Sequence, residues 1–172
     1  MKTKIKCGIF IAALFLAIQM LTGVSSAATT LPDAQNGEVT LNEDVTLSEK
    51  YVVPEGTTLQ INLNGNTLTG PNDNYTIENI GNLTIVDRKG TGKIVGIASS
   101  SSCVRNLGTL QANGVTIESS YIAIKNDATN KGNSDNPTDK DMYGVLDVQN
   151  SKLSTTCDKS GWEPYLTGQQ QQ

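Results

Sequence analysis

The sequence predicts an all-β chain wound as a right-handed parallel β-helix, a single-stranded solenoid of about four to five coils with three short strands per coil. Three observations lead to this fold class. Apolar and polar residues alternate in short runs, Gly, Asn, Asp and Ser fill the gaps between the runs, and the same positions recur along the chain. Alternation with period two is typical of strands, and recurrence at fixed places is typical of solenoids.

The first strand signals lie at residues 39–41, 45–47, 51–53 and 59–63. In the stretch TLQINLNGNTLTG (58–70), the alternation stops at Asn64-Gly65-Asn66 and then resumes. Because Asn and Gly adopt positive φ more readily than other residues, this tripeptide is predicted to turn the chain at a corner of the coil. The positions predicted to point inward are Leu59, Ile61, Leu63 and Leu68.

Later segments repeat the opening pattern, at residues 82–96, 109–120 and 145–156. Parallel strands stack about 4.8 Å apart, so equivalent residues should form columns through the interior. The predicted columns are Leu59, Leu83, Leu110 and Leu146; Leu68, Ile94, Ile117 and Leu153; and Ile77, Val104 and Ile124. Ordinary parallel pairs need a helical crossover, whereas the coil of a solenoid itself returns the chain. A β-sandwich, which also alternates strands and turns, is the alternative.

A second recurring position holds asparagine. Asn79, Asn106 and Asn126 each lie two residues after an apolar residue at the same place in three copies, at spacings of 27 and 20 residues. We expect their amides to form a hydrogen-bonded ladder, and we interpret them as stacked counterparts of the 64–66 corner.

Residues 1–27 have the layout of a secretory signal peptide: Lys2, Lys4 and Lys6, then an apolar run, then small residues. Cleavage is expected after Ala27 or else Ala28; an uncleaved anchor is the alternative. The remaining boundaries are an N-terminal cap with first strands (28–57), coils (58–156) interrupted by a polar loop (127–143), and a C-terminal cap or unstructured Gln-rich tail (157–172). The expected localisation is extracellular, in contact with the cell surface or free of it.

Charge and composition narrow the function classes. Removing three signal lysines changes the net charge from −4 to −7 (−4 − 3), so we expect neither nucleic acid nor anionic membrane as a partner. The chain has no histidine, which excludes Ser-His and Cys-His nucleophiles. No cofactor or metal is expected. Asp127, Asp135, Asp139 and Asp141 fit no established calcium-loop spacing, and a solvated loop is preferred to a calcium site.

Two cysteines remain after cleavage, Cys103 and Cys157. If Val104 points inward, strand alternation makes Cys103 point outward. Cys157 lies beyond the last strand, so we expect two free thiols and no disulfide.

The repeats are similar to the pectate-lyase-like β-helix repeats of secreted and surface proteins of Gram-positive bacteria. The matching stretches are VTLNEDVTLSEKYVVPEGTTLQINLNGNTLTG, TIENIGNLTIVDRKGTGKI and YIAIKND. The resemblance implies a β-helix and an adhesin-like or carbohydrate-contacting role.

Three functions follow as expectations. The preferred one is a non-enzymatic adhesin that contacts carbohydrate or a cell-surface protein, with Tyr143, Trp162 and Tyr165 as candidate ligand-binding residues, although capping of the last coil explains these aromatics as well. The alternatives are a spacer that associates weakly end to end and a polysaccharide lyase. The lyase hypothesis has only Asp87, Arg88 and Lys89 in one turn, and Arg105 is expected to pair with Glu78 across coils.

Overall fold

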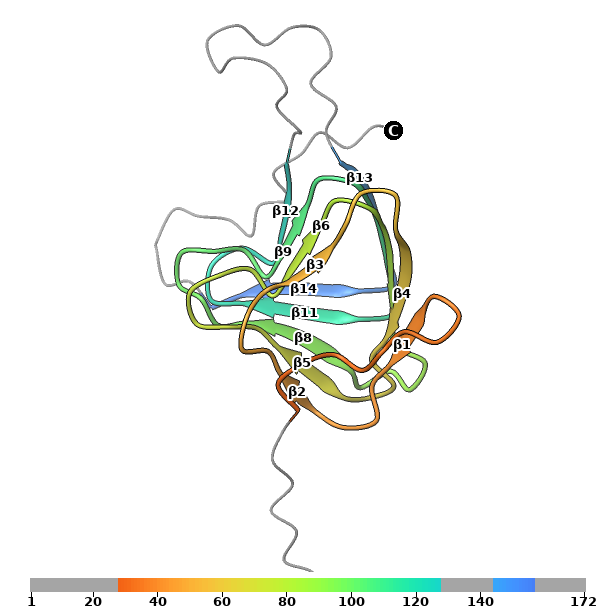
Figure 1. Cartoon of the computed structure of the whole chain (residues 1–172). Helices are drawn as coiled ribbons and strands as arrows, with labels where there is room; N and C mark the ends of the chain where they lie inside the picture. The colour runs from red at the N-terminus through yellow and green to blue at the C-terminus, as the bar shows by residue number, and fades with distance from the viewer. Residues whose placement is uncertain (1–27, 128–143, 157–172) are drawn as a thin grey trace, which may run out of the picture.

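The computed structural model describes residues 28–127 and 144–156, and every regular element in these ranges is a β-strand. All three sheets are parallel. The chain visits them in turn and winds as a right-handed parallel β-helix with the sheets as its three sides (Figure 1). The predicted fold class is confirmed.

Each sheet collects the equivalent strands of successive coils. Sheet I is formed by β1 (Glu38–Thr40), β4 (Thr58–Asn62), β7 (Asn82–Val86), β10 (Thr109–Asn113) and β13 (Val145–Gln149). Sheet II is formed by β2 (Val45–Thr46), β5 (Thr67–Thr69), β8 (Lys93–Gly96), β11 (Thr116–Ser119) and β14 (Lys152–Thr155). Sheet III is formed by β3 (Tyr51–Val53), β6 (Ile77–Asn79), β9 (Val104–Asn106) and β12 (Ile124–Asn126).

The strand register confirms the three predicted columns. Leu83 pairs with Leu59 on one side and Leu110 on the other, and Leu110 pairs with Leu146. The same stacking holds in the other two sheets. The column of sheet II contains Leu68, Ile94, Ile117 and Leu153. The column of sheet III contains Ile77, Val104 and Ile124. A fully buried Leu or Ile stabilises the fold by roughly 1.5–3 kcal/mol. The core is therefore a set of aliphatic columns along the solenoid axis.

The Asn64-Gly65 turn connects sheet I to sheet II. Asn64 and Gly65 have φ angles of 50° and 84°, and the Asn66 N–H donates to the Leu63 carbonyl at 2.9 Å. The side-chain amides of Asn64 and Asn66 both donate to the Leu41 carbonyl of the preceding coil, at 3.0 and 2.9 Å. The predicted corner is confirmed, and its asparagines tie it to the coil before it.

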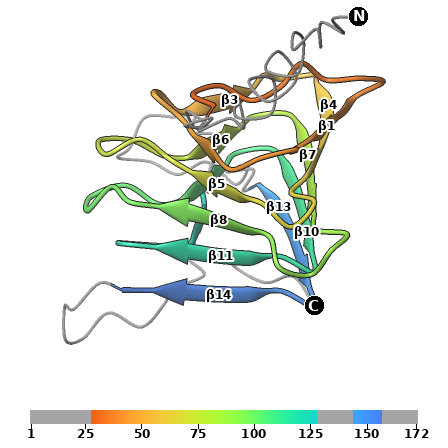
Figure 2. The ribbon, with the colours of Figure 1, turned by 90° about the horizontal axis from the view of Figure 1, so that it is seen from below.

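The two ends of the described solenoid differ. At the first coil, the Thr46 N–H donates to the Ala28 carbonyl at 2.8 Å, and Leu31 packs against the core, so Val39 and Val45 are almost fully buried. At the other end, β14 lies outermost below β11 (Figure 2). There Leu146, Val148 and Leu153 are only half-buried, and the Val145 side chain on β13 is 61% exposed.

Candidate functional site

The residues predicted to bind ligand or to be processed lie outside the described ranges. These are Tyr143, Trp162 and Tyr165 and the cleavage position Ala27; Cys157, predicted to be a free thiol, also lies outside them. Asp135, Asp139 and Asp141 of the polar loop also lie outside them. The candidate site is therefore built from residues 28–127 and 144–156 alone.

The asparagine ladder occupies the corner between sheets III and I. The Asn79 Nδ2 donates to Asn106 Oδ1 at 2.7 Å, and the Asn106 Nδ2 donates to Asn126 Oδ1 at 2.8 Å. Each amide also reaches a backbone carbonyl of the next coil, Thr109 for Asn79 and Val145 for Asn106, both at 2.9 Å. Asn79 and Asn106 are fully buried. The ladder consequently fastens a buried corner and presents nothing to a ligand.

One sequence-based expectation about this corner is wrong. The ladder was interpreted as the stacked counterpart of residues 64–66, but it follows the strands of sheet III, whereas 64–66 follows β4 of sheet I. The two sets of asparagines serve different corners of the coil.

Cys103 points inward, not outward as expected. Its side chain is fully buried in the core, and its Sγ donates to Thr76 Oγ1 at 3.6 Å. Residue 103 lies at the corner before β9, which starts at Val104, so strand alternation does not extend to it. Cys103 is a free thiol. Burial raises its pKa to about 12, and since the thiolate is the reactive form, this thiol is unreactive.

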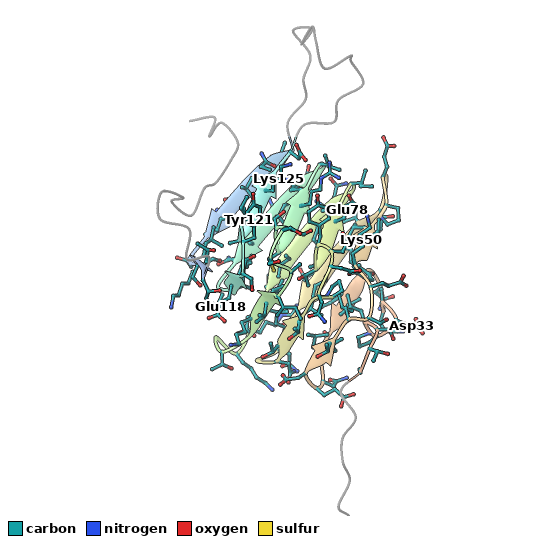
Figure 3. The ribbon with its side chains drawn as sticks, turned by 90° about the vertical axis from the view of Figure 1, so that its left-hand side faces the viewer. Asp33, Lys50, Glu78, Glu118, Tyr121 and Lys125 are labelled. Atoms are coloured by element: carbon teal, nitrogen blue, oxygen red, sulfur yellow. The ribbon has the colours of Figure 1, made fainter. Side chains whose placement is uncertain are left out.

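A row of paired charges crosses the outer face of sheet III. The charged row consists of Lys50, Glu78, Arg105, Asp127 and Lys125. Glu78 accepts from Lys50 at 2.5 Å and from Arg105 at 2.9 Å. Asp127 accepts from Arg105 at 3.0 Å and from Lys125 at 3.1 Å. Figure 3 shows Lys50, Glu78 and Lys125 on this side of the molecule. The cross-coil pair expected between Arg105 and Glu78 is present and belongs to a longer network.

Hydrogen bonds within the charged row favour the ionised form of its two carboxyl groups, Glu78 and Asp127. Burial raises the pKa of the Glu78 carboxyl, but hydrogen bonds from Lys50 and Arg105 outweigh burial and leave the pKa below its usual value. The same balance, with Lys125 and Arg105 as donors, lowers the pKa of Asp127. The Arg105 guanidinium also lies 5.5 Å from the centre of the Tyr75 ring, within cation–π range. The row is thus satisfied internally.

The turn proposed for lyase chemistry has a structural role. Asp87 accepts hydrogen bonds from the N–H groups of Gly65 (2.7 Å) and Gly92 (2.6 Å), which together with the Lys89 N–H outweigh burial and hold its pKa below the usual value. The Arg88 guanidinium pairs with Glu38 at 3.0 Å. Within the described ranges, no three His, Cys, Asp or Glu side chains gather closely enough to hold a metal ion.

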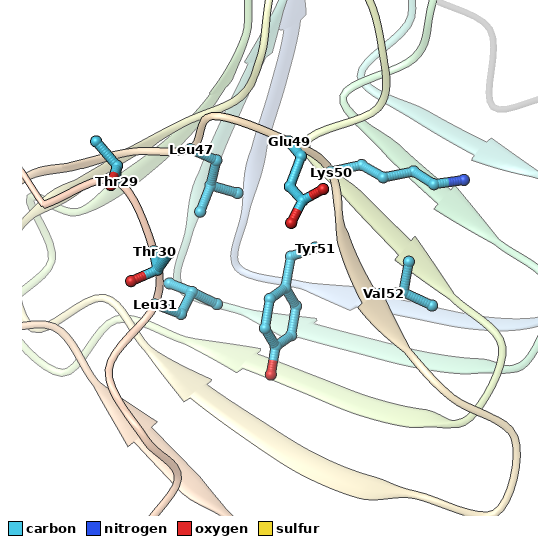
Figure 4. Close-up of a pocket in the computed structure, with 8 residues that line it drawn as sticks. All are labelled: Thr29, Thr30, Leu31, Leu47, Glu49, Lys50, Tyr51 and Val52. Carbon is cyan, nitrogen blue, oxygen red and sulfur yellow. The ribbon is translucent and has the colours of Figure 1, made fainter.

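An open pocket of about 460 Å³ lies where the N-terminal segment crosses the first coil, and sequence analysis did not anticipate it. Its walls come from Thr29, Thr30 and Leu31 on one side and from Leu47, Glu49, Lys50, Tyr51 and Val52 on the other (Figure 4). The half-buried Tyr51 ring lies between Leu31 and Val52 in the close-up. Burial raises the pKa of the Tyr51 phenol, which stays protonated at neutral pH.

The pocket is called the Tyr51 pocket below. It combines one aromatic ring with aliphatic side chains, two threonine hydroxyls and a carboxylate. Small-molecule sites in proteins have this make-up, a mostly apolar lining with a few polar groups that fix orientation. Lys50 lines the pocket and also begins the charged row, so the two features adjoin.

Comparisons with protein-family models, curated proteins and solved structures find no match for this chain. The described residues contain no helix long and apolar enough to cross a membrane.

Proposed function

We propose that this chain is a secreted, non-enzymatic, adhesin-like β-helical protein that contacts carbohydrate through the Tyr51 pocket. The observation that carries the proposal is the pocket itself, because its aromatic ring lies among aliphatic side chains and beside hydroxyl and carboxylate groups. A sugar ring has apolar C–H faces that pack on an aromatic ring and hydroxyls that hydrogen-bond at its edge, so the pocket suits a sugar unit.

Secretion and surface contact are supported by the sequence. The basic head, apolar run and small-residue exit before Ala28 favour export. Ala28 is already joined to β2, since its carbonyl accepts from the Thr46 N–H at 2.8 Å. Cleavage after Ala27 would therefore leave a chain whose first residue takes part in the fold. The similarity of the repeats to pectate-lyase-like repeats of Gram-positive surface proteins supports the adhesin-like role by analogy alone.

A glycan array probed with the secreted mature chain tests the proposal. We expect binding to a defined group of glycans, and we expect Tyr51→Ala to abolish it, whereas Tyr51→Phe should retain it because the ring is kept. Tyr121→Ala is the matched control, since Tyr121 lies between β11 and β12, outside the Tyr51 pocket. Absence of any glycan binding, or binding that Tyr51→Ala leaves unchanged, would contradict the proposal.

The enzymatic alternative has a direct assay. A lyase that acts on polygalacturonate releases unsaturated products with a characteristic ultraviolet absorbance. We expect the mature chain to release none, in line with the structural roles of Asp87 and Arg88. Release of such products, lost on Asp87→Asn, would replace the binding proposal with an enzymatic one.

A self-associating spacer is the second candidate function, and one observation favours it. Among the residues that the structure describes, β13 and β14 have strand partners on one side only, β10 and β11, and their inward residues are half-buried. Open strand edges pair readily with another chain. Light scattering across a hundredfold concentration range tests this candidate, and a monomer at every concentration would exclude it.

A further inference from the structure

The outer face of sheet I carries an uncharged polar patch at its middle strands. Leu83 and Ile85 of β7 point into the core, so Asn82 and Thr84 point outward, and β10 repeats this arrangement. The register places Thr109 beside Asn82 and Gln111 beside Thr84. These four residues, Asn82, Thr84, Thr109 and Gln111, are called the neutral patch. Asn82 and Gln111 are exposed and the two threonines are half-buried.

The side chains of the neutral patch are free. Among the described residues, no hydrogen bond, ion pair or ring contact occupies these four side chains. Towards the first coil, Gln60 and Arg88 both donate to Glu38, at 2.9 and 3.1 Å. The patch therefore offers unsatisfied donors and acceptors next to a region whose polar groups are already paired.

The paired region continues on the opposite side. Towards the last coil, Asn150 donates to Asn113 at 3.2 Å and Gln149 donates to Asp147 at 3.1 Å. Within the described residues, the neutral patch thus lies between these two sets of paired groups.

The other two outer faces are charged. Sheet III carries the charged row, and sheet II carries a Lys93–Glu118 pair at 3.2 Å. By contrast, neither β7 nor β10 contains a charged residue. The two middle strands have no ion to desolvate when an uncharged partner covers them, and the carboxylates of the outer strands, Glu38 and Asp147, offer no attraction to an acidic partner.

We infer that the neutral patch binds an uncharged polyhydroxylated chain, a neutral polysaccharide, as an extended surface separate from the Tyr51 pocket. Amide and hydroxyl side chains both donate and accept hydrogen bonds, as sugar hydroxyls do. Strand stacking fixes the backbone spacing of the rows at about 4.8 Å, so the spacing is already set before binding. The inference rests on the proposed carbohydrate-contacting function and narrows its substrate class, because the acidic chain, with a net charge of −4 before cleavage, repels acidic polysaccharides.

Affinity electrophoresis of the mature chain in gels containing a soluble neutral β-glucan, a neutral mannan or polygalacturonate tests the inference. We expect retardation by a neutral polymer and none by polygalacturonate. Thr84→Ala/Gln111→Ala should weaken the neutral interaction about tenfold or more, because two hydrogen-bonding side chains are removed. Thr69→Ala/Thr116→Ala, two outward threonines of sheet II, is the matched control and should bind like the wild type. Thermal unfolding verifies that each variant is folded.

The outcomes separate this inference from the proposed function. If Tyr51→Ala abolishes binding and Thr84→Ala/Gln111→Ala does not change it, the neutral patch is wrong and the pocket proposal stands. Preferential retardation by polygalacturonate also overturns the inference alone. If neither neutral nor acidic polymer retards the wild type and the glycan array is blank, both proposals fail.

Discussion

Replacing Asn106 by alanine tests the internal ladder directly. Asn106 is fully buried, accepts from Asn79 at 2.7 Å, and donates to Asn126 at 2.8 Å and to the Val145 carbonyl at 2.9 Å. The substitution removes both amide–amide bonds, each worth about 1 kcal/mol net. It also leaves the Asn126 Oδ1 without its donor in a buried site, at a further cost of about 1–2 kcal/mol. We therefore expect Asn106→Ala to lower the free energy of unfolding by about 3–4 kcal/mol.

Urea unfolding followed by circular dichroism measures this loss, provided that the slope of the transition is unchanged. In a thermal melt, the same loss corresponds to a fall in Tm of roughly 10 °C. Asn113→Ala is the matched control, because Asn113 is an exposed strand asparagine whose side chain makes one hydrogen bond among the described residues, with Asn150 at the surface. We expect the control to change stability by no more than about 0.5 kcal/mol.

Asn106→Asp sharpens the test through its pH dependence. An aspartate keeps the acceptor for Asn79 but turns a second oxygen towards Asn126 Oδ1 and the Val145 carbonyl, so the buried carboxyl should have a raised pKa. A raised folded-state pKa means that stability is lost as pH rises and recovers as pH falls. If the ladder has no energetic importance, Asn106→Ala will unfold at the same urea midpoint as Asn113→Ala. Asn106→Asp will then regain no stability as the pH falls.

Three further predictions concern single positions. The Asn79 Oδ1 is buried without a donor, and Val53 stacks on Asn79, so a threonine hydroxyl at position 53 would supply that donor. Urea titrations should therefore show Val53→Thr to be about 1 kcal/mol less destabilising than Val104→Thr, which buries the same hydroxyl elsewhere in the core. Equal losses in the two variants would contradict this. Because the pKa of Glu78 is lowered in the folded state, its contribution is present above the ordinary glutamate pKa of about 4.3 and is lost as pH falls below it; Glu78→Gln should flatten this acid limb in pH-dependent melts. Gly108→Ala would place a Cβ 2.1 Å from a carbonyl oxygen of the preceding coil, so we expect a loss of about 2–3 kcal/mol by calorimetry, and an unchanged Tm would show that the coils separate easily.

The parts of the fold that repeat could be predicted from the sequence. Leu83 and Leu110 occur at equivalent places because a parallel register stacks like on like, and the Glu78–Arg105 pair follows from the same alignment. Lys125 occupies the next place in that column and could have been added by the same reasoning. Lys50 could not, since it precedes β3 and reaches Glu78 diagonally.

The parts that do not repeat were missed or misplaced. Cys103 lies at a corner, and Gly96 makes room for it, because a Cβ at Gly96 would lie only 2.7 Å from the Cys103 Cβ. Alternation along one strand contains no information about such a contact between elements. The Tyr51 pocket forms only because residues 29–31 cross the first coil, and that segment has no counterpart in later coils from which its path could be inferred.

Inward and outward positions carry different kinds of information in this solenoid. The interior requires an aliphatic residue at a few places, an amide at the sheet III–I corner and a small residue where coils approach closely, and many sequences meet these conditions. A fold can therefore be recognised from such a pattern although the chain matches no family model. The outward positions are free of these conditions, yet the three sheets differ there: paired charges on sheet III, one ion pair on sheet II and uncharged amides and hydroxyls on the middle of sheet I. Because packing does not impose these differences, we expect binding specificity to reside in them.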